Sequence, residues 1–162
     1  GFCTQAQLFK VTAEAFLANP HLQEEVFGHV SVLVSCADQA QLLAVVRTLK
    51  GQLTGTLQAT AAELATQAEL ISLMRQKVGR LVVNNFPTGV EVCDAMMHGG
   101  PFPAATDARF TSVGTASIAR FVRPICFQNY PADLLPPELQ NANPWSLPRL
   151  INGVKTSAAV DA

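Results

Sequence analysis

Short apolar runs alternate with amphipathic stretches along the first half of the chain. The apolar run at residues 30–34 leads into a stretch that begins after Asp38 and ends near Gly51. Apolar side chains recur there at three- and four-residue steps, at Leu42, Val45, Val46 and Leu49. This spacing predicts an amphipathic helix between two buried strands. Asp38 is suited to cap the start of the helix, and Gly51 to end it.

The same order of elements recurs further along the chain. A strand is expected at residues 53–57, a helix from about Ala62, and a strand at residues 81–83. The apolar stripe of the helix consists of Leu64, Ala68, Ile71, Met74 and Val78. Gly79 is expected to close this helix. Because the last apolar run is continuous, we predict an α/β fold built from βαβ units with a mainly parallel sheet.

The flanking segments are less regular. A strand is predicted at residues 8–12 and a helix at residues 13–17, ending near Asn19-Pro20 because the residue before proline is pushed out of the helical region. Residues 86–110 are rich in glycine and proline and are expected to form a long loop, of the kind that is usually functional.

After this loop, a short helix is expected at residues 114–121. A strand at residues 124–127 begins with proline and would suit the edge of a sheet. The tail at residues 131–162 is expected to be extended, without regular structure.

Composition narrows the class of protein. The 162 residues are 49% hydrophobic and 14% charged, with a net charge of −1 and a mean hydropathy of +0.23. We expect one structural unit, no attraction for nucleic acid or anionic membranes, and some surface covered by a partner or by a further part of the polypeptide. The sequence has no long apolar run and no C-x-x-C pair among its four cysteines. These features indicate reduced thiols and a cytoplasmic protein without a membrane anchor.

The segment Glu24-Glu25-Val26-Phe27-Gly28 stands at the entrance of the strand at residues 30–34. A carboxylate there can accept hydrogen bonds from ribose hydroxyls, and a phenyl ring can pack on a flat heterocycle. The same residues also fit a plainer interpretation, in which acids at a helix end precede a core phenylalanine and a glycine C-cap.

The long loop and its entrance supply further candidates. Asn84 follows a strand at its carboxyl end, where α/β sheets bind ligands, although asparagine also forms turns there. Cys93, Asp94 and His98 supply only one short ligand spacing, whereas zinc sites usually repeat such a pair twice. We therefore predict no metal site and a histidine bonded to backbone carbonyls. The Gly99-Gly100 pair permits close approach of the backbone to a ligand or to another segment.

Together these motifs resemble the aldehyde dehydrogenase superfamily in its C-terminal part. The likeness is carried by the Glu24 to Gly28 segment, by Asn84-Asn85-Phe86-Pro87-Thr88-Gly89-Val90-Glu91-Val92-Cys93 and by Met96-Met97-His98-Gly99-Gly100-Pro101. Thr111-Ser112-Val113-Gly114 and Arg120-Phe121-Val122-Arg123-Pro124 add to it. The branch it resembles most is that of the α-ketoglutaric semialdehyde (2,5-dioxovalerate) dehydrogenases.

The resemblance implies roles for individual residues. Glu25 matches the glutamate that binds the nicotinamide-side ribose of NAD or NADP, and Phe27 matches the aromatic that positions the nicotinamide ring. Asn84, Gly99, Gly100 and Phe102 would border the aldehyde pocket. In this family a cysteine thiolate attacks the aldehyde, hydride passes to the cofactor, and a glutamate-activated water releases the acid.

The chain also departs from the family pattern. It lacks the Gly-rich cofactor domain, the oxyanion asparagine and the general-base glutamate, and the surroundings of Cys3 only faintly match those of the nucleophile. We therefore expect residues 1–130 to be part of a catalytic domain, inactive alone, that forms homo-oligomers through an interface strand at residues 123–128. The alternative is a stand-alone, non-catalytic α/β oligomerisation module. A small nucleotide-binding domain is disfavoured, because no Gly-rich turn follows a strand.

Overall fold

The computed structural model describes residues 4–87 and 89–160. Two compact units follow one another, Gly1–Val122 and Arg123–Ala162. No helix in the described part of the chain has both the length and the apolar character needed to cross a membrane. Cys36, Cys93 and Cys126 are free thiols.

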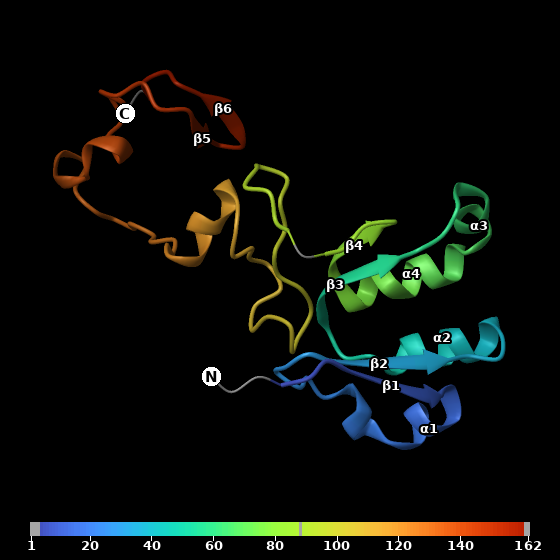
Figure 1. Cartoon of the computed structure of the whole chain (residues 1–162). Coiled ribbons are helices and arrows are strands. Elements are labelled where there is room, and N and C mark those ends of the chain that lie inside the picture. The colour runs from blue at the N-terminus through green and yellow to red at the C-terminus, as the bar shows by residue number, and fades with distance from the viewer. Residues whose placement is uncertain (1–3, 88, 161–162) are drawn as a thin grey trace. The chain divides into compact units, whose positions relative to one another are not determined.

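The first unit begins with a βαβ motif. β1 (Gln7–Thr12) pairs in parallel with β2 (Val30–Ser35), and α1 (Ala13–Ala18) and the short 3-10 helix η1 (Pro20–Gln23) connect them (Figure 1). The Thr12 side chain caps α1 by accepting a hydrogen bond from the Ala15 N–H, at 3.3 Å. Asn19 ends the helix directly before Pro20. The sequence-based strand and helix at this end of the chain are confirmed.

Helix α2 (Gln39–Thr48) follows β2. Asp38 is its N-cap, as predicted, and its carboxylate accepts a hydrogen bond from the Gln41 N–H at 2.9 Å. The helix ends with Leu49 as its C-cap, two residues before Gly51. The prediction that Gly51 ends this helix is therefore wrong. Gly51 is buried, and its lack of a side chain makes room for the backbone of Pro101.

A second βαβ motif follows. β3 (Gln52–Leu57) pairs in parallel with β4 (Val78–Val83), and the helices α3 (Ala61–Thr66) and α4 (Ala68–Lys77) lie between them in sequence. Thr60 and Glu63 form a capping box that starts α3. The predicted single helix is split at Gln67, and Gly79 lies inside β4 instead of closing the helix. The α/β class is confirmed, and among the described residues each parallel pair forms a sheet of its own.

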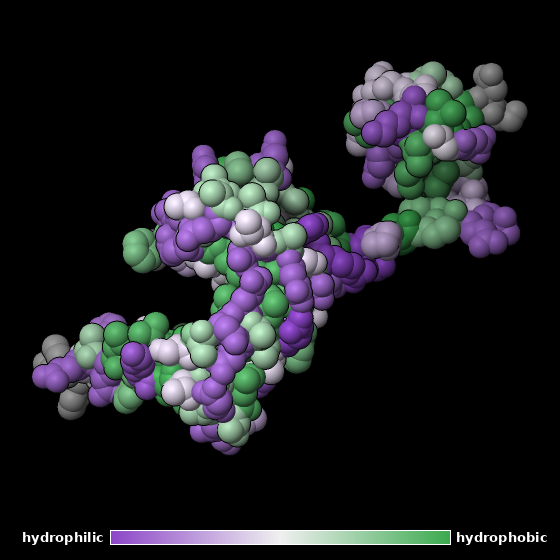
Figure 2. All heavy atoms as spheres, turned by 90° about the vertical axis from the view of Figure 1, so that its right-hand side faces the viewer, coloured by the Kyte–Doolittle hydropathy of each residue, from purple (hydrophilic) through white to green (hydrophobic). Residues whose placement is uncertain are grey.

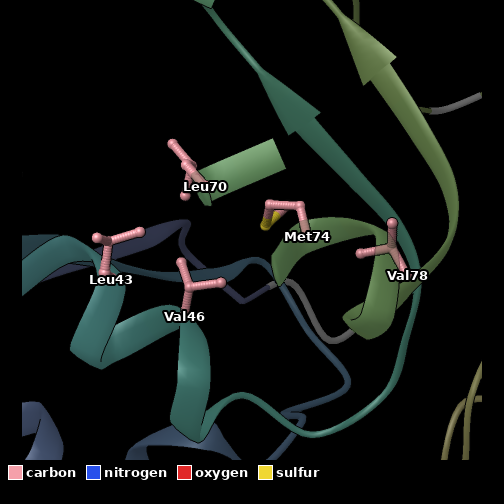
Figure 3. Close-up of a cluster of buried hydrophobic side chains, with 5 residues drawn as sticks. All are labelled: Leu43, Val46, Leu70, Met74 and Val78. Atoms are coloured by element: carbon pink, nitrogen blue, oxygen red, sulfur yellow. The ribbon is translucent and has the colours of Figure 1, made fainter. Parts of the chain in front are cut away.

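Two hydrophobic clusters stabilise the first unit. One consists of Leu43, Val46, Leu70, Met74 and Val78 (Figure 3). The other consists of Ala13, Phe16 and Val45. Because α2 contributes to both clusters through different faces, it packs between α1 on one side and α4 on the other.

Glycines allow the loop at residues 98–102 to lie against the amino ends of β3 and β4. A Cβ on Gly79 would lie 1.9 Å from the Gly99 carbonyl oxygen, and one on Gly51 would lie 2.1 Å from that of Pro101. One on Gly100 would lie 2.6 Å from the Gln52 carbonyl oxygen. We call Gly51, Gly79, Gly99 and Gly100 the glycine junction. Its backbones touch closely because none of the four residues carries a side chain.

The second unit contains more regular structure than the sequence suggested. β5 (Arg149–Ile151) and β6 (Val154–Thr156) form an antiparallel hairpin, preceded by the 3-10 helices η3 (Ala132–Leu134) and η4 (Pro137–Leu139). Asn152 and Gly153 both have positive φ angles, 48° and 84°, as the tight turn of a hairpin requires. The prediction of a tail without regular structure is wrong, because the Asn-Gly pair forms the turn of a hairpin.

Residues 115–128 contain one 3-10 helix and no strand. Residues 115–120 form the 3-10 helix η2 (Thr115–Arg120), within the helix predicted at residues 114–121. The strand predicted at residues 124–127 is absent from the described structure, since these residues pair with no other described strand. An interface strand at residues 123–128 stays a prediction, because its hydrogen bonds would require a second chain.

Candidate functional site

The Glu24 to Gly28 segment lies between η1 and β2 and is open to solvent. Glu24 is engaged locally, with its carboxylate 3.1 Å from the His21 ring nitrogen. Glu25 accepts no hydrogen bond from any residue that the structure describes, and its side chain is exposed. Phe27 is 94% exposed, so the core-phenylalanine interpretation does not hold. A phenyl ring that is almost fully exposed, next in sequence to an exposed carboxylate without a hydrogen-bond partner among the described residues, indicates a binding surface.

A hollow of about 420 Å³ adjoins this segment at the amino ends of β1 and β2. Gly28 and His29 contribute one wall, and β1 residues such as Leu8 contribute another. The Gln7 N–H donates to the His29 carbonyl at 2.8 Å and fixes the two walls to each other. Exposed hydrophobic side chains occur elsewhere too, and Figure 2 shows them in green between polar neighbours.

Asn84 lies at the carboxyl end of β4, as predicted. Its side-chain oxygen accepts a hydrogen bond from the Ala59 N–H at 2.9 Å, and its side-chain nitrogen donates to the Ala59 carbonyl at 2.7 Å. Asn84 also has a positive φ of 52°. The amide therefore connects the exit of β4 to the loop after β3, which supports the turn-forming interpretation of this residue.

Gly99 and Gly100 are buried in the glycine junction, at the opposite end of β4 from Asn84. The neighbouring Phe102 is 79% exposed. The structure thus brings Gly99, Gly100 and Phe102 together and leaves Asn84 a strand length away. Close approach to another segment, one of the two purposes considered for the glycine pair, is present here.

A second hollow, of about 490 Å³, is formed by the loop after the glycine junction. Its wall includes His98, Asp107, Ser112 and Arg120. The Arg109 side chain donates three hydrogen bonds to the Asp107 carboxylate and holds the pKa of that carboxyl at about 2, below its ordinary value of 3.8. The His98 N–H donates to the Thr111 hydroxyl at 2.8 Å, which fixes the backbone of this loop residue. Its ring Nδ1 is buried and has no partner among the described residues, so the predicted bonding of this histidine to backbone carbonyls is wrong.

Cys3, the candidate nucleophile, lies outside the described residues. Within the described ranges, no three His, Cys, Asp or Glu side chains gather as a metal site. The sequence interpretation missed Arg80, whose side chain donates to two loop carbonyls. The signal available was a lone arginine inside an otherwise apolar strand.

Comparison with known proteins finds relatives of this chain. No family model matches the chain. However, the chain is 51% identical over 146 residues to alpha-ketoglutaric semialdehyde dehydrogenase 2 of Azospirillum brasilense. It is 50% identical over 153 residues to alpha-ketoglutaric semialdehyde dehydrogenase of Acinetobacter baylyi. Over almost its whole length the chain is therefore similar to one part of these aldehyde dehydrogenases.

The likeness covers 90% and 94% of the chain but only 28% and 29% of the two relatives. The chain thus spans less than a third of the length of the aldehyde dehydrogenases it matches. The resemblance drawn from the sequence is confirmed.

Proposed function

We propose that this chain supplies the C-terminal part of an NAD(P)-dependent aldehyde dehydrogenase that oxidises α-ketoglutaric semialdehyde to the carboxylic acid. Residues 1–130 would belong to the catalytic domain and residues 131–162 to a C-terminal tail. The two relatives carry the name of that aldehyde. The observation that carries the proposal is the exposed pair Glu25 and Phe27 beside the hollow at the start of β1 and β2.

The residues present fit a nicotinamide cofactor. The Phe27 side chain is almost fully exposed, and packing a flat heterocycle on its ring would remove apolar surface from water. The Glu25 carboxylate keeps its acceptor oxygens available, which suits two adjacent ribose hydroxyls. When bound, NAD or NADP supplies the hydride acceptor of the oxidation. Glu25 and Phe27 then orient the ribose and the ring.

The isolated chain should not catalyse the reaction. The described cysteines, Cys36, Cys93 and Cys126, are free, and the structure pairs none of them with a histidine, aspartate or glutamate as a base. The thiolate and the base would come from polypeptide matching the rest of the relatives' length. Turnover of α-ketoglutaric semialdehyde by the purified chain with NAD or NADP would refute this point. Free, widely spaced thiols also support a cytoplasmic location.

The whole proposal is tested in a chimera. The 146-residue matching segment of the Azospirillum brasilense relative is replaced by that of this chain, and reduction of NAD(P) is followed with α-ketoglutaric semialdehyde. We expect activity, together with a KM for the cofactor that rises about tenfold or more in Glu25→Gln, equivalent to about 1.4 kcal/mol of lost binding. Glu24→Gln is the matched control, since among the described residues the Glu24 carboxylate forms a hydrogen bond only with His21.

Phe27→Ala in the same chimera should also raise the KM for the cofactor. Phe121→Ala is its control, because Phe121 is 81% exposed but lies outside the candidate site. Equal effects of Glu25→Gln and Glu24→Gln, or of the two phenylalanine variants, would remove the assignment of the cofactor site. An inactive chimera beside an active relative would remove the proposed activity.

A second function, homo-oligomerisation, is favoured by the segment at residues 123–128. Ile125 is 65% exposed, and the segment pairs with no other described strand. An extended apolar segment with free backbone groups is suited to strand addition by a second copy. Size-exclusion chromatography with light scattering separates the alternatives: a discrete soluble oligomer favours the oligomerisation module, whereas aggregation favours a part removed from its enzyme.

A further inference from the structure

Arg80 lies on the face of β4 that points away from the helices. Gly55, which pairs with Leu81, faces α4, since a Cβ there would lie 2.4 Å from the Met74 methyl group. Leu81 packs against the same hydrophobic cluster. Because side chains alternate along a strand, Arg80 and its partner Thr54 lie on the opposite face.

The Arg80 guanidinium holds the chain that follows β4. One terminal nitrogen donates to the Gly89 carbonyl at 2.7 Å, and the other donates to the Pro87 carbonyl at 3.0 Å. Arg80 is the third residue of the strand, so the chain must turn back along β4 to reach it. We call residues 84–87 and 89–92 the return loop. Its two anchored carbonyls are fixed by a rigid, planar fork of donors.

Apart from these two hydrogen bonds, the Arg80 guanidinium has no partner among the described residues. Its Nε is buried and has no partner among the described residues, and the Thr56 hydroxyl on the same face is buried and unpartnered too. No described carboxylate pairs with Arg80. The carbonyls of the return loop are therefore the groups that stabilise this charge, and donors that carry a charge form the stronger hydrogen bonds.

The return loop presents apolar side chains to solvent. Phe86 is 79% exposed, Val92 is 76% exposed and Val90 is 38% exposed. Large apolar side chains grouped on one short loop are suited to form a wall of a substrate pocket. Their positions depend on the backbone of the loop, which Arg80 fixes at Pro87 and Gly89.

We propose that Arg80 is a positioning residue, which sets the return loop so that Phe86, Val90 and Val92 form one wall of the aldehyde pocket. This inference rests on the proposed function. Arg80 itself touches no substrate. Lysine would keep the charge but cannot donate to both carbonyls from one rigid plane, so the two variants separate charge from geometry.

The test uses Arg80→Gln and Arg80→Lys, with Arg75→Gln as the control because Arg75 is exposed on α4 and makes no hydrogen bond among the described residues. In the purified chain, hydrogen exchange of return-loop amides should become about tenfold faster in both Arg80 variants, while exchange in α2 and α4 stays unchanged. Faster exchange everywhere, or no change in the loop, would overturn the anchoring role.

In the chimera, both Arg80 variants should raise the KM for the aldehyde about tenfold and leave the KM for the cofactor within twofold. A purely structural role would lower kcat through loss of folded enzyme and leave both KM values unchanged, which would overturn the proposal. If the unsubstituted chimera is inactive beside an active relative, the proposed function fails and the aldehyde pocket fails with it. The exchange experiment then still decides whether Arg80 anchors the loop.

Discussion

Replacing Gly79 by alanine tests the glycine junction directly. The new Cβ would lie 1.9 Å from the Gly99 carbonyl oxygen and 2.5 Å from the Gly99 carbonyl carbon. The first contact is about 1.5 Å short of the 3.4 Å at which ordinary contact begins, and both contacts are with backbone atoms. No side-chain rotation relieves them, so the loop at residues 98–102 must move away from β4. Overpacking typically costs ~1–3 kcal/mol, and we expect the upper part of this range.

Urea unfolding of the purified chain measures this cost. Gly89→Ala is the matched control, because no atom lies within 4 Å of a Cβ at that position. A new alanine also restricts the unfolded chain, so the control should be neutral or slightly stabilised, by up to about 1 kcal/mol. Displacement of the loop should in addition expose the Ser112 N–H, which donates to the His98 carbonyl at 2.9 Å. If Gly79→Ala and Gly89→Ala unfold at the same urea concentration, the close backbone contact is not present in solution.

Two further predictions concern the core and the second hollow. Met74→Ala removes a side chain of the hydrophobic cluster that is only 9% exposed, and it should lower the free energy of unfolding in urea by ~2–5 kcal/mol. Met74→Leu should lower it by less than about 1.5 kcal/mol. Equal losses in the two variants would contradict the packing of Met74. The Asp107 carboxyl should titrate by NMR near pH 2, because the Arg109 side chain donates to it, and Arg109→Gln should return its pKa toward 3.8. Since folding lowers this pKa, the pair stabilises the fold above about pH 4, and that contribution is lost as the pH falls through 2; an Asp107 titration unaffected by Arg109→Gln would refute it.

The elements at the start of the chain were predictable because local signals agreed with packing. Asp38 caps a helix whose apolar stripe lies in the core, and Pro20 follows the end of α1. The split at Gln67 was not predictable, because the apolar period continues across it. Gly51 and Gly79 looked like helix ends, and only the contacts with the loop at residues 98–102 reveal why they are glycines.

The sequence motif selects the candidate residues, but only part of their arrangement in space follows from it. Glu25 and Phe27 were identified by their motif, and their exposure agrees with a contact surface. The engagement of Asn84 with Ala59 depends on how the β3 and β4 exits meet, which no local pattern encodes. The contacts of Arg80 are with backbone carbonyls, which carry no signature in the sequence, so its role emerges only from the folded chain.

Helix α2 makes the two βαβ motifs energetically dependent on each other. Leu43 and Val46 pack in one hydrophobic cluster with residues of α4, and Val45 packs in the other with residues of α1. If α2 unfolds, both clusters therefore lose buried side chains. Loss of order in one motif is thereby passed on to the other. Two spectroscopic reporters, one near Phe16 and one near Met74, should therefore follow the same all-or-none melting curve.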